Sequence, residues 1–152
     1  MRVAWVVAVA LASGAGAAAA DEVPRAWTLA VEPAWGRIHD DDGAAAGSLR
    51  AFRALDRGGR LRAQAGLTLS SYGALDVGIE VRLCRSCRVA PVLGVGGGLL
   101  SEEEYGGTFA RATAGLEAVL APRVVLRATV QAGTHDGQAG PHLAALGLGW
   151  RF

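Results

Sequence analysis

Leu146-Gly147-Leu148-Gly149-Trp150-Arg151-Phe152 closes the sequence and is its most informative stretch. In an extended strand, successive side chains point to opposite faces. The two leucines, the tryptophan and the phenylalanine at 146–152 therefore share one face, and the glycines share the other with the arginine. In a soluble protein, the apolar face of such a strand needs a hydrophobic core, whereas in a membrane barrel it meets lipid. Whether this strand faces a protein core or lipid has to be inferred from the rest of the sequence.

The other end of the sequence has the features of an export signal. Arg2 precedes an apolar run over residues 4–11, and three alanines at 18–20 supply small residues for cleavage. The apolar run is shorter than the roughly 20 residues that a membrane-spanning helix needs. We therefore expect residues 1–20 to be a cleaved signal peptide and residues 21–152 to form one mature domain.

The composition excludes some classes of partner and fold. All 15 basic residues are arginines, and without Arg2 the 14 that remain match the 14 acidic residues. Because there is neither a net basic charge nor a basic helix, nucleic acid is not an expected partner. Mean hydropathy is high at +0.28, yet no run after residue 20 reaches the roughly 18 apolar residues of a spanning helix. Apolar residues dispersed at every second position would account for both observations.

Alternation of apolar and polar residues predicts eight strands. The clearest segment is 74–84, in which Leu75, Val77 and Ile79 oppose Asp76 and Glu80. Most segments are close to the roughly 9–11 residues with which a tilted strand crosses a bilayer. The expected strands are residues 26–38, 48–55, 60–70, 74–84, 87–100, 108–120, 123–133 and 141–152.

The connections between these segments predict the topology. Those after the first, fifth and seventh strands are long or acidic, as at residues 39–43, whereas those after the second, fourth and sixth are tight. An even number of strands with loops at one end and turns at the other predicts an all-β, eight-stranded antiparallel up-and-down transmembrane β-barrel with both termini in the periplasm. The phase of segment 48–55 stays open, because Arg50 and Phe52 share one face while Leu49 and Arg53 share the other.

Periodicity alone does not tell which face of a strand points inward. The export signal, the nearly uncharged apolar faces and the matched charges of the polar faces all favour a polar interior, where buried charges need partners. The expected interior charge network is Glu32, Arg62, Asp76, Glu80, Arg82, Arg111, Glu117 and Arg127. Aromatic residues near the strand ends predict two membrane-interface girdles. These residues are Trp27, Trp35, Tyr72, Tyr105, Trp150 and Phe152.

With these features, residues 21–152 resemble the small eight-stranded outer-membrane β-barrels of Gram-negative bacteria, the OmpA-barrel and OmpX-like group. The resemblance depends on the signal, the strand rhythm and the closing residues 147–152. It implies a location in the cell outer membrane, in contact with its lipid and with lipopolysaccharide. It also implies that Leu148, Trp150 and Phe152 form a C-terminal signal that the barrel assembly machinery binds transiently.

Cys84 and Cys87 flank the turn at 85–86, and an oxidising periplasm favours a disulfide between them. A C-x-x-C pair also suits redox chemistry or a metal, but no thioredoxin-like helix follows and there is no second pair of ligands. Free thiols remain the third alternative. No cofactor is expected, because the glycines at 94–98 are followed by neither the Lys-Ser/Thr pair nor the helix of a phosphate-binding loop.

Acidic residues and all three histidines gather in the regions expected on the loop side. A solvated rim is the expected role of the acidic residues, although their oxygens would suit Ca²⁺ or Mg²⁺, and we assign no metal site. These residues are His39, Asp40, Asp41, Asp42, Glu102, Glu103, Glu104, His135, Asp136 and His142.

The sequence favours a non-enzymatic outer-membrane barrel with a structural or surface-interaction role, too narrow for a wide pore. One alternative is a lipid A deacylase-like hydrolase with His135 or His142 beside Asp136, although no serine lies near either histidine in sequence. Its nucleophile would then have to come from Ser48, Ser70, Ser71 or Ser101. Another alternative is a soluble, lipocalin-like periplasmic barrel whose apolar faces point inward.

Overall fold

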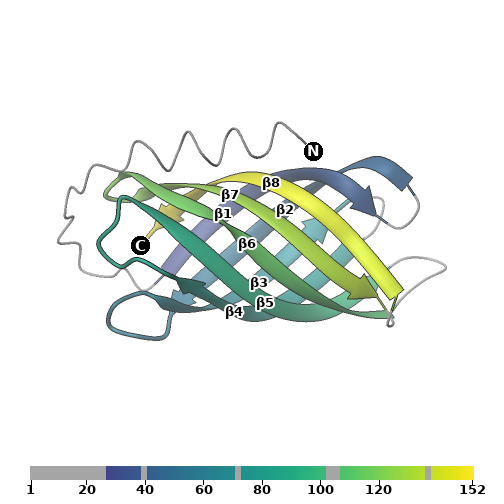
Figure 1. Cartoon of the computed structure of the whole chain (residues 1–152), viewed down its shortest axis with the longest axis horizontal. Coiled ribbons are helices and arrows are strands. Elements are labelled where there is room, and N and C mark those ends of the chain that lie inside the picture. The colour runs from purple at the N-terminus through teal and green to yellow at the C-terminus, as the bar shows by residue number, and fades with distance from the viewer. Residues whose placement is uncertain (1–26, 39–40, 71–72, 102–106, 136–137) are drawn as a thin grey trace.

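The computed structural model describes residues 27–38, 41–70, 73–101, 107–135 and 138–152. They form eight antiparallel strands that close into one barrel, in which each strand pairs with its neighbour in sequence and β1 pairs with β8 (Figure 1). The predicted all-β, up-and-down architecture is confirmed. The strands are β1 (Trp27–Ile38), β2 (Asp41–Ala54), β3 (Leu61–Leu69), β4 (Gly73–Arg82), β5 (Val89–Ser101), β6 (Gly107–Ala121), β7 (Val124–His135) and β8 (Gln138–Arg151).

The first and last strands join along most of their length. Leu29 lies opposite Trp150 and Val31 opposite Leu148, and the Phe152 amide donates to the Trp27 carbonyl at 2.9 Å. We call the end of the barrel where β1 begins and β8 ends the terminal end, and the opposite end the loop end. The connections at 55–60, 83–88 and 122–123 belong to the terminal end. No helix in the described ranges is long and apolar enough to cross a membrane.

Two strands begin three or more residues earlier than the sequence predicts, and one expectation about the connections is wrong. β2 begins at Asp41 and β8 at Gln138, so most of the expected loops at 39–43 and 134–140 are paired strand instead. The longer connections, at 55–60 and 83–88, lie at the terminal end and not at the loop end. Antiparallel ladders are held by backbone hydrogen bonds, so the hairpins extend through residues whose side chains show no alternation.

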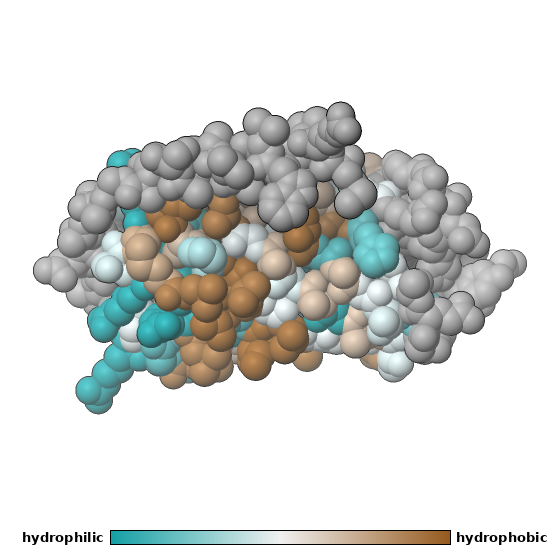
Figure 2. Space-filling model, in the orientation of Figure 1, coloured by the Kyte–Doolittle hydropathy of each residue, from teal (hydrophilic) through white to brown (hydrophobic). Residues whose placement is uncertain are grey.

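The apolar faces of the strands point outward. Val77, in the middle of β4, is 66% exposed, and its neighbours Leu75 and Ile79 on the same face are also exposed. Figure 2 shows hydrophobic residues gathered along the barrel wall. This arrangement is that of a barrel surrounded by lipid, and the soluble barrel with inward apolar faces is not supported. In β2, Arg50 and Phe52 are buried inside, which fixes the phase that the sequence left open.

Glycines on β4 and β5 permit a close approach of the two backbones. A Cβ atom on Gly98 would lie 1.8 Å from the Leu75 carbonyl oxygen, and one on Gly78 would lie 2.4 Å from the Val95 carbonyl oxygen. Neither position can carry a side chain without moving a neighbouring strand. The glycine-rich run of β5 therefore serves the packing of the barrel wall.

The β2–β3 turn at the terminal end is organised by Asp56. Its carboxylate accepts hydrogen bonds from the amides of Gly58 at 3.1 Å and Leu61 at 2.8 Å, and Gly59 has a left-handed φ of 63°. Desolvation opposes ionisation of Asp56, but the backbone amides outweigh it and hold the pKa of this carboxyl below its usual value. Asp56 is thus a charged residue whose hydrogen bonds are made to its own turn.

Candidate functional site

The middle of the barrel interior is filled by three glutamates and the arginines between them. Glu80 and Glu117 are fully buried, and Glu32 is almost so. Arg62 pairs with Glu117 at 2.7 Å and also with Glu80. These side chains come from β1, β3, β4 and β6. Arg62 and Glu80 lie opposite each other on the paired strands β3 and β4, whereas the Arg62–Glu117 pair spans the interior and joins strands that are not neighbours.

Arg127 on β7 is the centre of this cluster. Its three guanidinium nitrogens pair with Glu32 at 2.9 Å, Glu80 at 2.6 Å and Glu117 at 2.9 Å. Its guanidinium also lies over the Phe52 ring, 4.2 Å from the ring centroid. Arg127 thereby contacts the neighbouring strand β6 and, across the lumen, β1, β2 and β4, with its side chain only 2% exposed.

A second cluster lies toward the loop end. Asp76 pairs with Arg50 at 3.0 Å and with Arg111 at 2.6 Å, and Gln131 accepts a hydrogen bond from Arg111 at 3.3 Å. Arg50 also pairs with Glu32 at 3.0 Å. Arg50 therefore connects the two clusters into one network that runs through the barrel.

The structure places all eight sequence-predicted network residues in the interior and adds two arginines. Arg50 was missed because the phase of its strand was open, and Arg151 because it adjoins the end of the chain; Arg151 pairs with Glu117 at 2.9 Å. Six described arginines thus share four carboxylates, where the sequence suggested four of each. In keeping with this excess of donors, the Nε atoms of Arg62 and Arg111 have no hydrogen-bond partner in the described part of the chain.

Two glycines make room for the network. A Cβ atom on Gly66 would lie 2.8 Å from Asp76 Oδ2 and 2.9 Å from Arg50 Nη1, and one on Gly147 would lie 2.5 Å from Glu32 Cγ. Larger side chains at these positions would displace the ion pairs. Small residues on the inner face are therefore part of the charged site.

An apolar layer separates the network from the loop end. Ala74 and Leu100 pack with Phe109 on one side of the lumen, and Leu143 packs with Ala34 on the other. Between this layer and the Asp76 cluster lies a cavity of about 20 Å³, enough for a single water molecule. This cavity is lined by Asp76 and Arg111 on one side and by Leu100, Phe109 and Leu143 on the other.

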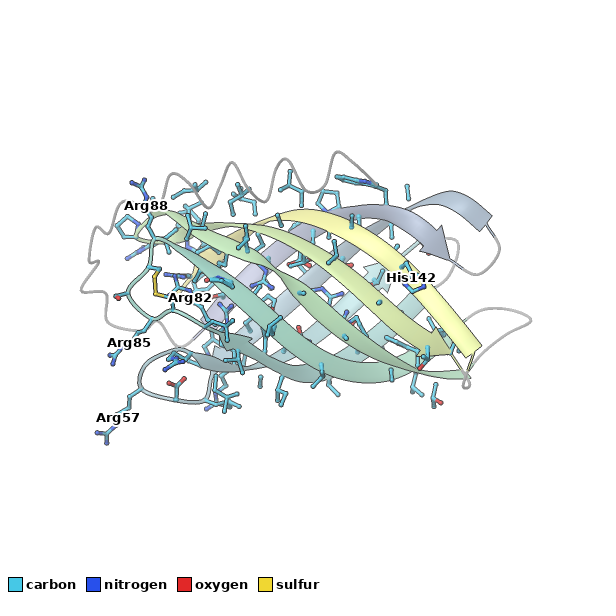
Figure 3. The ribbon with its side chains drawn as sticks, in the orientation of Figure 1. Arg57, Arg82, Arg85, Arg88 and His142 are labelled. Carbon is cyan, nitrogen blue, oxygen red and sulfur yellow. A yellow bond between two sulfur atoms is a disulfide. The ribbon has the colours of Figure 1, made fainter. Side chains whose placement is uncertain are left out.

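Cys84 and Cys87 form a disulfide in the β4–β5 connection at the terminal end. The guanidinium of Arg82 donates to the carbonyls of Cys84 and Arg85 at 2.7 Å each and to the Cys87 carbonyl at 2.6 Å. Figure 3 shows Arg82 beside the yellow sulfur–sulfur bond. Since Arg82 also lies 3.4 Å from Glu117, the turn is tied to the central network.

Replacing both cysteines with serine is expected to lower the free energy of unfolding by about 2 kcal/mol. The effect is no larger because the bond closes a very short loop and so restricts the unfolded chain only a little. Urea titration of the barrel in lipid vesicles, with and without a reducing agent, measures this change. The serine variant should not respond to the reductant. Equal stability of the oxidised and reduced native protein would contradict the stabilising role of the bond.

The aromatic residues predicted for the girdles divide between the two ends. Trp27, Trp150 and Phe152 are exposed at the terminal end, and Trp35 is exposed toward the loop end. Tyr72 and Tyr105 lie outside the described residues. In the proposed assembly signal, Leu148 shares the outward face with Trp150 and Phe152.

The two described histidines, His135 and His142, are not arranged as a hydrolase site. His135 faces the interior, whereas His142 points outward from β8 near the loop end, as Figure 3 shows. Neither β8 nor the strands that flank it, β1 and β7, contain a serine. Ser48 is buried inside the barrel and shares a hydrogen bond with Thr68 at 2.9 Å, so it cannot act on lipid outside. Asp136 lies outside the described residues.

No metal-binding group of three or more His, Cys, Asp or Glu side chains occurs in the described part of the chain. The side chains of the acidic residues that the sequence predicts at the loop-side rim are not described by the structure. Asp40, Glu102, Glu103 and Glu104 lie outside the described ranges, as does His39, and the side chains of Asp41 and Asp42 are not described.

No protein-family model and no curated protein matches this sequence. Solved structures match its fold. Neisserial surface protein A is 12% identical, with 83% of this chain and 96% of that chain covered and a TM-score of 0.60. The N-terminal barrel domain of Pseudomonas aeruginosa OprF is 13% identical, with 82% and 97% covered and a TM-score of 0.59. Yersinia pestis Ail is 16% identical, with 84% and 99% covered and a TM-score of 0.57.

These likenesses confirm the resemblance that the sequence suggested, and the predicted location in the outer membrane agrees with them. The identities are too low to carry more than the fold. With its closed ring of eight antiparallel strands and its outward apolar faces, this chain has the fold of the small outer-membrane β-barrels.

Proposed function

We propose that this protein is a non-enzymatic, integral outer-membrane barrel with a structural or surface-interaction role and an interior closed by its own side chains. The observation that carries the proposal is the ion-pair network that crosses the lumen beneath an outward apolar surface. We further propose that the terminal end faces the periplasm, that lipid and lipopolysaccharide surround the barrel, and that residues 1–20 are removed on export.

Several features support a closed interior. Eight strands enclose a space that side chains can fill. The four carboxylates of the network are buried and each contacts at least one arginine. An ion that crossed the barrel would have to displace these pairs and then pass the apolar layer around Leu100 and Leu143. Both obstacles disfavour a diffusion pore.

Conductance across a planar lipid bilayer tests the closed interior. The native barrel should give no steady channel steps. A variant in which Arg62, Arg127, Glu80 and Glu117 are all replaced by serine removes equal numbers of positive and negative charges, and it should conduct small ions if it folds. Val95→Ala, on the outward face, is the control and should stay closed.

Folding of each variant is verified by heat-modifiable mobility on a gel before its conductance is measured. Steady steps from the native barrel would contradict the closed interior. A folded serine variant that does not conduct would contradict the central ion pairs as the barrier and would assign it to the Asp76 cluster and the apolar layer.

A further inference from the structure

Among the side chains that the structure describes, the arginines outside the barrel lumen are confined to the terminal end. Every described arginine whose side chain is exposed comes from the end of β2 or from one of the three connections there. Figure 3 shows Arg57, Arg85 and Arg88 projecting from this end. We call this set the arginine rim. It consists of Arg53, Arg57, Arg60, Arg85, Arg88 and Arg123.

The positive charge of the rim is not neutralised by described carboxylates. Asp56 is the acidic residue described at this end outside the lumen; it is half-buried, and its oxygens accept hydrogen bonds from the amides of its own turn. Arg60 donates to the Leu83 carbonyl at 3.5 Å and Arg88 to the Val119 carbonyl at 3.1 Å. None of the six rim arginines forms an ion pair with an acidic residue of the described ranges.

The rim directly adjoins the apolar wall. Arg53 lies over the Trp27 ring, with its guanidinium carbon 5.5 Å from the ring centroid, and Leu61 and Leu83 are exposed at the same end. Tryptophan at the edge of an apolar belt lies at the depth of lipid head groups. The Arg53–Trp27 pair therefore places a cation where the phosphates of a surrounding leaflet would lie.

We propose that the arginine rim binds the phosphate groups of anionic phospholipids in the periplasmic leaflet. The guanidinium group matches phosphate through paired N–H donors. The rim residues come from the end of β2 and from the β2–β3, β4–β5 and β6–β7 connections, so they are distributed around the barrel. A leaflet contacts a barrel on every side, whereas a protein partner docks on one face. The proposal rests on the proposed insertion with the terminal end toward the periplasm.

Quenching of tryptophan fluorescence by brominated lipids tests this proposal. The mature chain with Trp35→Phe reports from Trp27 and Trp150, both at the terminal end. It is inserted into phosphatidylcholine vesicles that contain phosphatidylglycerol, with either lipid brominated in turn. We expect phosphatidylglycerol to be enriched around the rim, and the enrichment to fall as salt is raised because exposed charges are screened.

The matched variants change the three rim arginines that have no side-chain partner among the described residues. Arg57→Gln, Arg85→Gln and Arg123→Gln together should lower the enrichment about fivefold or more, since basic residues close to a membrane surface attract anionic lipids. The corresponding triple lysine variant keeps the charge and should retain most of the enrichment. Millimolar glycerol phosphate in solution should not displace the lipid.

The possible results distinguish a failure of the rim proposal from a failure of the proposed membrane insertion. Equal quenching by the two lipids in the native barrel would overturn the rim proposal while leaving insertion intact. Absence of quenching by either lipid would instead overturn insertion. Displacement by glycerol phosphate would assign the rim to a soluble anion, and preferential binding of polyglutamate would assign it to an acidic protein; either result would overturn the lipid proposal.

Discussion

Replacing Arg127 with methionine is expected to lower the free energy of unfolding by about 3–5 kcal/mol, the cost of removing one partner from a buried ion pair. Methionine keeps much of the length of the side chain, so the charge and its hydrogen bonds are the main loss. Glu32, Glu80 and Glu117 each lose a contact of 2.6–2.9 Å. All three carboxylates are buried, so bulk water does not replace the lost contacts.

Urea unfolding in lipid vesicles, followed by tryptophan fluorescence, measures the effect. Arg123→Met is the control, because Arg123 is exposed in the β6–β7 connection. In vesicles of phosphatidylcholine alone, which offer the arginine rim no anionic lipid, it should change stability by less than about 0.5 kcal/mol. Adding Glu80→Gln to Arg127→Met should restore part of the loss, since one uncompensated charge is then removed. If Arg127→Met were as stable as the control, the network would not hold the barrel together.

Replacing Val77 with arginine should lower the free energy of unfolding by about 2–4 kcal/mol, as a charge on the lipid face at the bilayer midplane does. Val77 lies in the middle of β4 and is 66% exposed. In water, an arginine at so exposed a position would be tolerated. The size of the effect therefore reports what surrounds the barrel wall.

Leu83→Arg is the matched control, since Leu83 is also exposed but lies just beyond the end of β4. The cost of a charge near the membrane interface falls to about 0–1 kcal/mol. Unfolding in vesicles of both variants gives the difference between the two depths. An equal, small effect at Val77 and Leu83 would show that the wall faces water and would remove the basis for a membrane barrel.

The sequence predicted the strands and their inward faces where side chains alternate in polarity. Residues 74–84 show this alternation most clearly, and β4 lies there. The prediction failed at the start of β2, because residues 41–47 read Asp-Asp-Gly-Ala-Ala-Ala-Gly and have small or polar side chains on both faces. Such a segment carries no periodic signal, and its pairing with β1 depends on backbone hydrogen bonds.

The alternation of polarity likewise predicted most members of the interior network, but it did not predict which of them form ion pairs. Arg127 meets Glu32 across 95 positions of sequence, and this contact depends on the stagger of the strands and on how far each side chain reaches across the lumen. Alternation predicts the face of the strand on which a side chain lies, but not its position along the barrel axis. Arg50 shows the same limit, because its strand has an arginine on either face.

The ion pairs across the lumen also constrain how the protein is assembled. Glu32 belongs to the first strand and Arg127 to the seventh, so they meet only when the sheet has curled round and its two edges have joined. An unclosed sheet within the bilayer would expose these charges to acyl chains, at a cost of several kcal/mol for each. Insertion and closure must therefore proceed together, and the same residues that fill the finished barrel penalise every partly inserted intermediate.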